Sequence, residues 1–232
     1  PMYGDETTDL PNLSSLRKDG ILYKNSYSPV PVCAPARSSI ITGMYPTSIG
    51  THNMRTFAEY PQPKPSKDVI NYSPVPKSSV KMFTEYLRKN NYYTTNYGKE
   101  DCNFKKTDGS WDFSCTNDCS GKLEPIWRDR NVDQPFFSVF NFGITHESQI
   151  WLRDEQWLQV NPENLKVPPF FPNDSITRHS MAVNYSNILE ADKQIGMIIQ
   201  RLKEQNLYDN SYIFFYSDHG GPFPRHKRAI YE

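Results

Sequence analysis

Three apolar segments of the chain each end in a cluster of polar, ionisable side chains, and this repetition is the strongest constraint on the fold. The segments are rich in aromatic and β-branched residues, which predicts strands over 92–97, 136–142 and 211–217. Elsewhere in the chain, apolar residues recur at helical spacing, which predicts helices over 11–20, 78–90 and 176–205. Strands that alternate with helices are typical of an α/β fold with a mostly parallel sheet. Ligands of such sheets bind where the strands end, so we expect the three polar clusters to meet at one edge.

The remaining segments fit the same architecture. A further strand is predicted over 21–27, and the near-continuous apolar run 136–142 is typical of a central strand that is covered on both faces. Pro-rich stretches without periodicity predict long irregular connections over 56–77 and 150–177. The first of these connections could line a substrate cleft.

The stretch from Pro31 to Ser39 concentrates reactive chemistry. Prolines precede the site, and the serines and apolar residues that follow predict a short helix that begins near Cys33. A helix N-terminus favours an anionic nucleophile or an oxyanion, and Arg37 adds a permanent positive charge about one turn away. The alternative interpretation is an inert, buried cysteine that acts as a small hydrophobic residue.

The polar clusters that follow the predicted strands supply further candidates. Asp218 and His219 pair a hard carboxylate with an imidazole, donors that suit a divalent cation, although a turn with a surface histidine explains this pair equally well. His146 changes its charge near neutral pH, as a general acid must, whereas a lone histidine at a strand end is more often simply hydrogen-bonded. Lys99 taken alone is typical of a solvated surface lysine.

Charge and cysteine content narrow the classes of function. The 26 basic and 26 acidic residues balance, so nothing indicates bulk attraction to nucleic acid or to an anionic membrane. No apolar run approaches the ~20 residues of a membrane span. Besides a catalytic Cys33, the remaining Cys102, Cys115 and Cys119 allow at most one disulfide, and the Cys115–Cys119 pair is too sparse for a zinc site.

The segment that runs from Cys33 through Pro35, Arg37 and Thr42-Gly43 to Tyr45-Pro46 resembles the signature of the sulfatases. This resemblance implies an alkaline-phosphatase-like α/β sandwich and a maturation enzyme that converts Cys33 into formylglycine. The hydrated aldehyde of formylglycine would attack the sulfur of a sulfate ester or N-sulfate group. The implied substrate is a sulfated polysaccharide or glycosaminoglycan, and the implied location is secreted, periplasmic or lysosomal.

The same resemblance implies a role for each candidate residue. The catalytic residues would be Cys33, Arg37, Lys99, His146 and Lys227. Asp218 and His219 would bind a divalent cation, expected to be Ca²⁺. The residues in contact with the substrate would be His52, Arg55 and Arg228. Where the family commonly has a histidine two residues beyond its lysine, this chain has Asp101.

The resemblance extends over nearly the whole chain, and in the segment Ser217–Pro224 it is strongest to the heparan N-sulfatase (N-sulfoglucosamine sulfohydrolase) branch. Two aspartates that complete the family's metal site would precede Pro1. We therefore expect residues 1–232 to be part of a sulfatase catalytic domain, without its first metal-binding strand and its C-terminal subdomain. Two alternatives stay open: a phosphoester or phosphonate hydrolase of the same superfamily, and an inactive relative that only binds.

Overall fold

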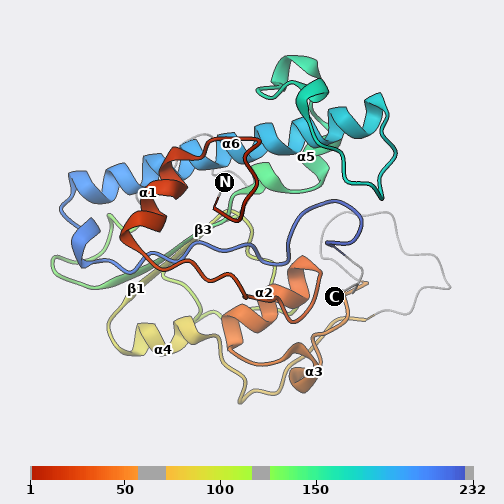
Figure 1. Cartoon of the computed structure of the whole chain (residues 1–232). Coiled ribbons are helices and arrows are strands. Elements are labelled where there is room, and N and C mark those ends of the chain that lie inside the picture. Colours follow the sequence, from red (N-terminus) through yellow and green to blue (C-terminus); the bar gives the residue numbers. More distant parts are fainter. Residues whose placement is uncertain (1, 57–71, 117–125, 228–232) are drawn as a thin grey trace. The chain divides into compact units, whose positions relative to one another are not determined.

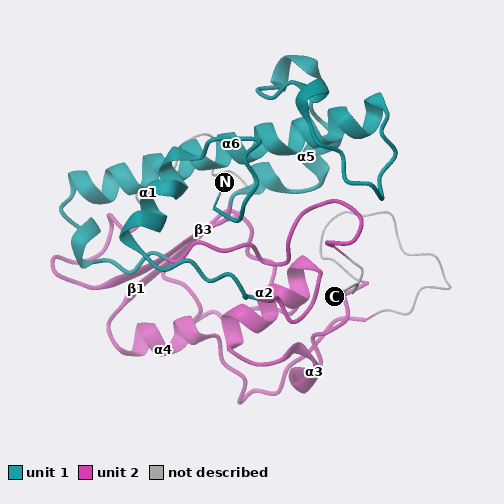
Figure 2. Cartoon of the chain, viewed as in Figure 1, with its two compact units in different colours: residues 1–26, 121–125, 142–213 teal, residues 27–120, 126–141, 214–232 magenta. Residues whose placement is uncertain are grey.

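The computed structural model describes residues 2–56, 72–116 and 126–227. The chain divides into two compact units, each assembled from separate stretches of sequence (Figure 1, Figure 2). Unit 1 comprises residues 1–26, 121–125 and 142–213, and unit 2 comprises residues 27–120, 126–141 and 214–232. Each unit therefore depends on contacts between residues that are far apart in the sequence.

Helices make up most of the regular structure. The helices of unit 1 are α1 (Pro11–Asp19), η1 (Gly143–Thr145), α5 (Ser148–Trp151), η2 (Glu155–Trp157), η3 (Pro162–Asn164), α6 (Ser175–Glu204) and η4 (Tyr208–Asn210). The elements of unit 2 are α2 (Cys33–Thr42), α3 (Pro46–Ile49), α4 (Phe83–Lys89), β1 (Tyr93–Tyr97), β2 (Phe113–Cys115) and β3 (Phe136–Phe140). The helices predicted over 11–20 and 176–205, and the helix predicted to begin near Cys33, are confirmed as α1, α6 and α2.

The strands of unit 2 form a parallel sheet with the order β2-β1-β3. Tyr97, the last residue of β1, is in register with Cys115 of β2 and Phe140 of β3, so the three strands end at the same edge. The predicted α/β class with a parallel sheet is thus confirmed. The interpretation of β3 as a central strand is wrong, because among the described strands it lies at an edge and is only half-buried.

Aromatic packing explains why β3 is so apolar in spite of its edge position. Phe136 and Phe140 lie on one face of the strand, and their ring centroids are 5.4 and 5.9 Å from that of Trp127. Phe137 lies on the other face, with its ring centroid 5.0 Å from that of Phe83 in α4. The apolar run therefore follows from an aromatic contact on each face rather than from a strand on each side.

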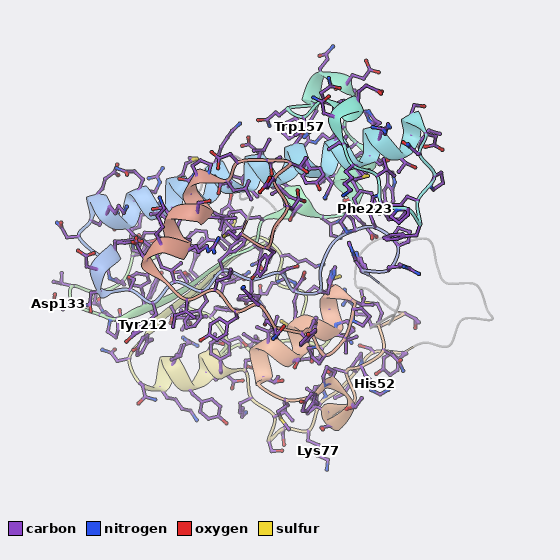
Figure 3. All side chains as sticks on the ribbon, in the orientation of Figure 1. His52, Lys77, Asp133, Trp157, Tyr212 and Phe223 are labelled. Carbon is purple, nitrogen blue, oxygen red and sulfur yellow. The ribbon has the colours of Figure 1, made fainter. Side chains whose placement is uncertain are left out.

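Three further predictions differ from the structure. The segments 21–27 and 211–217 form no strand among the described residues, and their aromatic side chains are exposed, Tyr212 by 95% (Figure 3). Aromatic and β-branched content favours a strand only where a neighbouring strand completes the ladder. The helix predicted from residue 78 begins at Phe83, because the backbone N–H of Met82 donates to Glu85 Oε1 at 3.0 Å and fixes the first turn there.

Unit 1 is organised around the long helix α6 (Figure 1). Leu10, just before α1, and Leu13 within it form a buried cluster with Ile195 of α6. In the irregular segment that precedes α6, Trp157 donates from Nε1 to the Asn187 side chain at 2.8 Å (Figure 3). The Pro-rich stretch predicted over 150–177 is thereby tied to the helix.

The described cysteines differ in their bonding. Cys115 is disulfide-bonded, whereas Cys33 and Cys102 are free thiols. Cys119 lies outside the described residues. Within the described part of the chain, no helix combines the length and the apolar character needed to cross a bilayer.

We expect Asp192→Ala to lower the free energy of unfolding by about 2–3 kcal/mol, because a charged acceptor of backbone hydrogen bonds is lost. Asp192 is 2% exposed, and its carboxylate accepts the backbone N–H groups of Asn12 at 3.2 Å and Leu13 at 2.8 Å in the first turn of α1. Urea unfolding monitored by circular dichroism measures the loss. Glu190→Ala is the control, since its exposed contact with Lys193 contributes less than about 1 kcal/mol. Equal losses in the two variants would contradict the capping role.

Candidate active site

Cys33 is the first residue of α2 and is buried, with 8% of its surface exposed. The preceding Val32 is extended, with φ −140° and ψ 138°, and its carbonyl accepts the Ala36 N–H at 2.9 Å, which begins the helix at this point. The helix ends at Gly43, whose φ of 67° is the left-handed conformation that glycine adopts without strain. The thiol therefore lies at the positive end of a helix, as the sequence predicts.

Arg37 connects α2 to three other parts of unit 2. Its Nε lies 3.1 Å from Asp218 Oδ2, and its Nη1 donates to Asn141 Oδ1 at 2.6 Å and to the Lys99 carbonyl at 3.5 Å. The side chains of Arg37 and Asp218 are 21% and 23% exposed. This partly buried guanidinium holds the loop after β1, the residue after β3 and the Asp218 segment around the start of α2.

The environment of Cys33 lowers the pKa of its thiol to about 6. A hydrogen bond with the His219 side chain is the largest cause, and burial works in the opposite direction. Lys99 adds a hydrogen bond and its positive charge, and the charge of Lys227 acts in the same direction. The structure thus brings together Cys33, Arg37, Lys99, Asp218, His219 and Lys227, which are six of the predicted site residues.

Asn141 belongs to this site although sequence reasoning did not identify it. Its Nδ2 donates to the Tyr97 carbonyl at 2.9 Å and to Asn96 Oδ1 at 3.0 Å, while its Oδ1 accepts from Arg37. The chain approaches closely here, since a Cβ added to Gly98 would lie 2.7 Å from the Asn141 carbonyl oxygen. Gly98 also has φ 81°, so both its conformation and the available space require glycine. In the sequence, Asn141 could have been noticed as an amide side chain near the end of the apolar run 136–142. The neighbouring strand β1 is followed by Gly98.

Two of the predicted substrate residues, His52 and Arg55, lie in the segment that follows α3. His52 is exposed (Figure 3). The guanidinium of Arg55 is paired with Asp101, which it contacts through Nη1 and through Nη2, the latter at 2.7 Å. Asp101 therefore binds Arg55 at the position where the family commonly has a histidine. Arg228 lies outside the described residues.

His146 lies in unit 1, whereas the other described candidates lie in unit 2. It follows η1, and its Nδ1 accepts the backbone N–H of Ser148 at 3.3 Å and lies 2.9 Å from the Ser148 hydroxyl. Because Nδ1 accepts the amide hydrogen, the proton of the neutral ring is on Nε2. His146 can therefore donate a proton from Nε2.

The residues proposed to bind a cation offer only part of a coordination sphere. Asp218 presents a carboxylate that contacts Arg37, and its Oδ1 lies 3.5 Å from His219 Nε2. His219 Nδ1 is buried and has no hydrogen-bond partner among the described residues. Nowhere in residues 2–56, 72–116 and 126–227 do three or more His, Cys, Asp or Glu side chains gather in a way that could hold a metal ion. Because Ca²⁺ takes six to eight oxygen ligands, these residues do not by themselves fit the expected ion.

We expect Cys33 of the unprocessed protein to react with iodoacetamide much faster than Cys102 at pH 7. Burial raises the pKa of Cys102 to about 12, whereas the pKa of Cys33 is lowered to about 6, so only Cys33 is largely thiolate. Its reaction rate should fall as the pH drops below about 6. Peptide mass spectrometry over a pH series measures both rates.

Lys99→Met should shift the pH midpoint of Cys33 alkylation upward, because Lys99 stabilises the thiolate. Lys77→Met is the matched control, since Lys77 is exposed and is not among the groups that lower this pKa (Figure 3). Comparable rates for Cys33 and Cys102 at pH 7 would refute this description of the site.

Comparison with known proteins identifies the family of the chain. The sequence model of the Sulfatase family matches residues 2–230. An ulvan-active sulfatase of Formosa agariphila is 39% identical, over 100% of this chain and 43% of that protein. The N-sulphoglucosamine sulphohydrolase of Homo sapiens, which represents the branch indicated by the sequence, is 23% identical over 99% of this chain and 49% of that protein. The chain thus spans less than half the length of these relatives.

The fold has a counterpart among solved structures. A crystal structure described as a sulfatase from Bacteroides fragilis superposes with a TM-score of 0.63 and 20% identity, over 94% of this chain and 58% of that one. At this identity the likeness shows the fold alone, and it agrees with the alkaline-phosphatase-like sandwich implied by the sequence. Taken with the match over residues 2–230, these findings show that the chain belongs to the sulfatase family.

Proposed function

We propose that the full-length protein is a sulfatase that hydrolyses sulfate esters or N-sulfate groups of a sulfated polysaccharide or glycosaminoglycan. The observation that carries this proposal is Cys33 at the start of α2, where His219, Lys99 and Lys227 stabilise an anion. The same cationic surroundings suit a sulfuryl group, whose oxygens carry negative charge throughout its transfer. Formylglycine at position 33, made by a maturation enzyme, would supply an oxygen nucleophile that is regenerated in each turnover.

The other residues of unit 2 have separate tasks in this proposal. Arg37, held by Asn141 and Asp218, keeps a fixed positive charge beside the nucleophile. Lys99 and Lys227 bind the sulfuryl oxygens and stabilise the charge that develops on them. Lys227 is buried, with 8% exposed, so its charge is weakly screened by solvent.

We assign the leaving-group proton to His146. Its Nε2 carries the proton of the neutral ring, because Nδ1 accepts the Ser148 amide. As the bond between sulfur and the sugar oxygen or nitrogen breaks, His146 would protonate the departing atom. A histidine suits this task because its pKa lies near neutral pH.

Sulfatases generally use a divalent cation, and we propose Asp218 and His219 as ligands of such an ion, with Ca²⁺ expected. When bound, the cation would supply positive charge beside the nucleophile and the sulfuryl group. The described residues provide two donors, so no step of the reaction is assigned to the ion.

The substrate side of the site is proposed on the exposed surface after α3. His52 and Arg228 would contact the saccharide, while Arg55 would act there together with Asp101. A polymeric sulfated substrate also fits a secreted, periplasmic or lysosomal protein, which is the location we propose.

We expect mass spectrometry of the full-length protein, expressed with a competent maturation enzyme, to find an aldehyde at position 33 that hydrazine reagents trap. Cys33→Ala should abolish turnover of 4-nitrophenyl sulfate, because the nucleophile is absent. Cys102→Ala is the control and should keep the activity. The raised pKa of Cys102 keeps its thiol protonated, and the proposal gives this residue no catalytic role. A retained thiol at position 33 would instead support the inactive, binding-only alternative.

We expect the full-length protein to turn over 4-nitrophenyl sulfate at least ~10-fold faster, in kcat/KM, than 4-nitrophenyl phosphate, a difference of about 1.4 kcal/mol in transition-state binding. The phosphate dianion carries an additional negative charge, and a site tuned to the sulfate monoanion stabilises it less well. Steady-state rates at one pH and ionic strength measure the ratio. A reversed ratio would favour the phosphoester or phosphonate hydrolase.

A further inference from the structure

Arg55 and Asp101 form a two-pronged ion pair between separate loops of unit 2. Both terminal nitrogens of Arg55 contact the two carboxylate oxygens of Asp101, and the Nη2–Oδ2 distance is 2.7 Å. The side chains are 18% and 23% exposed, so solvent screens them only partly. A guanidinium bound in this way fixes the direction of its partner as well as the distance.

Asn103 connects the same two loops through hydrogen bonds that involve backbone groups. Its Oδ1 accepts the Arg55 N–H at 3.1 Å, and its own N–H donates to Asp101 Oδ1 at 3.1 Å. Its Nδ2 donates to the carbonyls of Thr51 and Asn53, at 2.9 and 2.7 Å. The Asn103 side chain therefore binds the backbone on both sides of His52.

These contacts are buried and continue to the helix that carries the nucleophile. Asn103 and Thr51 are both 0% exposed, and the Thr51 hydroxyl lies 2.6 Å from that of Ser38 in α2. At the other end of the loop after β1, the Lys99 carbonyl accepts from Arg37 at 3.5 Å. The backbone that carries Lys99 is therefore held at residue 99 by α2 and at residues 101–103 by the segment around His52.

We propose that Arg55, Asp101 and Asn103 form a brace that positions Lys99 and His52 around residue 33, so that the sulfuryl site and the saccharide site are aligned by one network. This inference rests on the proposed function. It gives Asp101 a positioning role and assigns Arg55 to Asp101 rather than to direct contact with the sugar.

The test uses the full-length, matured protein with 4-nitrophenyl sulfate, which has no sugar for His52 to contact. The variants are Asp101→Asn, Arg55→Gln, their combination, and Asn103→Gly, which keeps the left-handed φ of 67° while removing the amide. Arg88→Gln is the matched control, because Arg88 pairs with Asp112 at 2.8 Å, and Asp112 accepts the N–H of Thr94 toward the start of β1. Rates are expressed per formylglycine, and the melting temperature of each variant is measured.

We expect each brace variant to lower kcat by about 10-fold or more while KM changes by less than about twofold, because a displaced ammonium stabilises the transition state poorly. The combined Arg55 and Asp101 variant should be no worse than either single variant, since either one already opens the brace. Arg88→Gln should leave kcat unchanged even where it lowers the melting temperature.

Three results would overturn the proposal. One is a normal kcat in folded Asp101→Asn protein, and another is a combined loss that multiplies the two single losses. The third is an increase in KM confined to the Arg55 variant, which would indicate that its guanidinium contacts the sulfate group directly instead of acting through Asp101. If the wild-type protein turns over neither sulfate nor phosphate esters, the proposed function fails. Calorimetric binding of orthovanadate, which mimics the trigonal-bipyramidal transition state, then tests the brace alone, and equal affinity in wild type and Asp101→Asn would refute it.

Discussion

A single guanidinium joins three separate parts of unit 2. Arg37 reaches from α2 to Asp218, to Asn141 at the end of β3 and to the Lys99 carbonyl after β1. A guanidinium keeps its charge at every pH that a folded protein tolerates, so Arg37 itself stays cationic at this junction. It forms where the parallel strands end together, which is why residues far apart in the sequence surround Cys33.

The two free cysteines show how strongly the surroundings decide the chemistry of one residue type. Cys33 is hydrogen-bonded by His219 and Lys99, and the pKa of its thiol falls to about 6. Burial dominates at Cys102, where the pKa rises to about 12, although Arg37 and Lys106 oppose the shift. The sequence motif identifies Cys33 as the reactive cysteine. The positive charge around its thiol comes from residues in distant segments of the chain.

Local patterns predicted the elements whose own sequence carries a clear periodicity or strand composition. The periodicity of α6, the stretch from Pro31 to Ser39 at the start of α2 and the β-branched residues of β1 were sufficient for their assignment. The residues 211–217 had equal strand propensity, but that tendency is realised only by a partner strand. β2 has three residues, which is too few to show an alternating pattern. The aromatic residues that β3 needs for its ring contacts give it the apolar sequence that is typical of a central strand.

The candidate site divides in the same way. Cys33, Arg37, Lys99 and Asp218 were found because each lies in a motif or at the end of an apolar run. Asn141 was missed because its function is a hydrogen bond to a side chain 104 residues away. Asn103 was missed because its left-handed backbone and its grip on Thr51 and Asn53 leave no trace in composition.

The close approach at Gly98 has a practical consequence for the redesign of this member of the sulfatase family. A side chain at residue 98 would meet the Asn141 backbone and would also demand an unfavourable φ, so neither repacking nor a flexible neighbour can accommodate it. The exposed stretch at residues 52–54 carries no such restriction on its side chains. Under the proposed function, a mutagenesis library aimed at new saccharides would therefore vary these three positions and hold residue 98 constant.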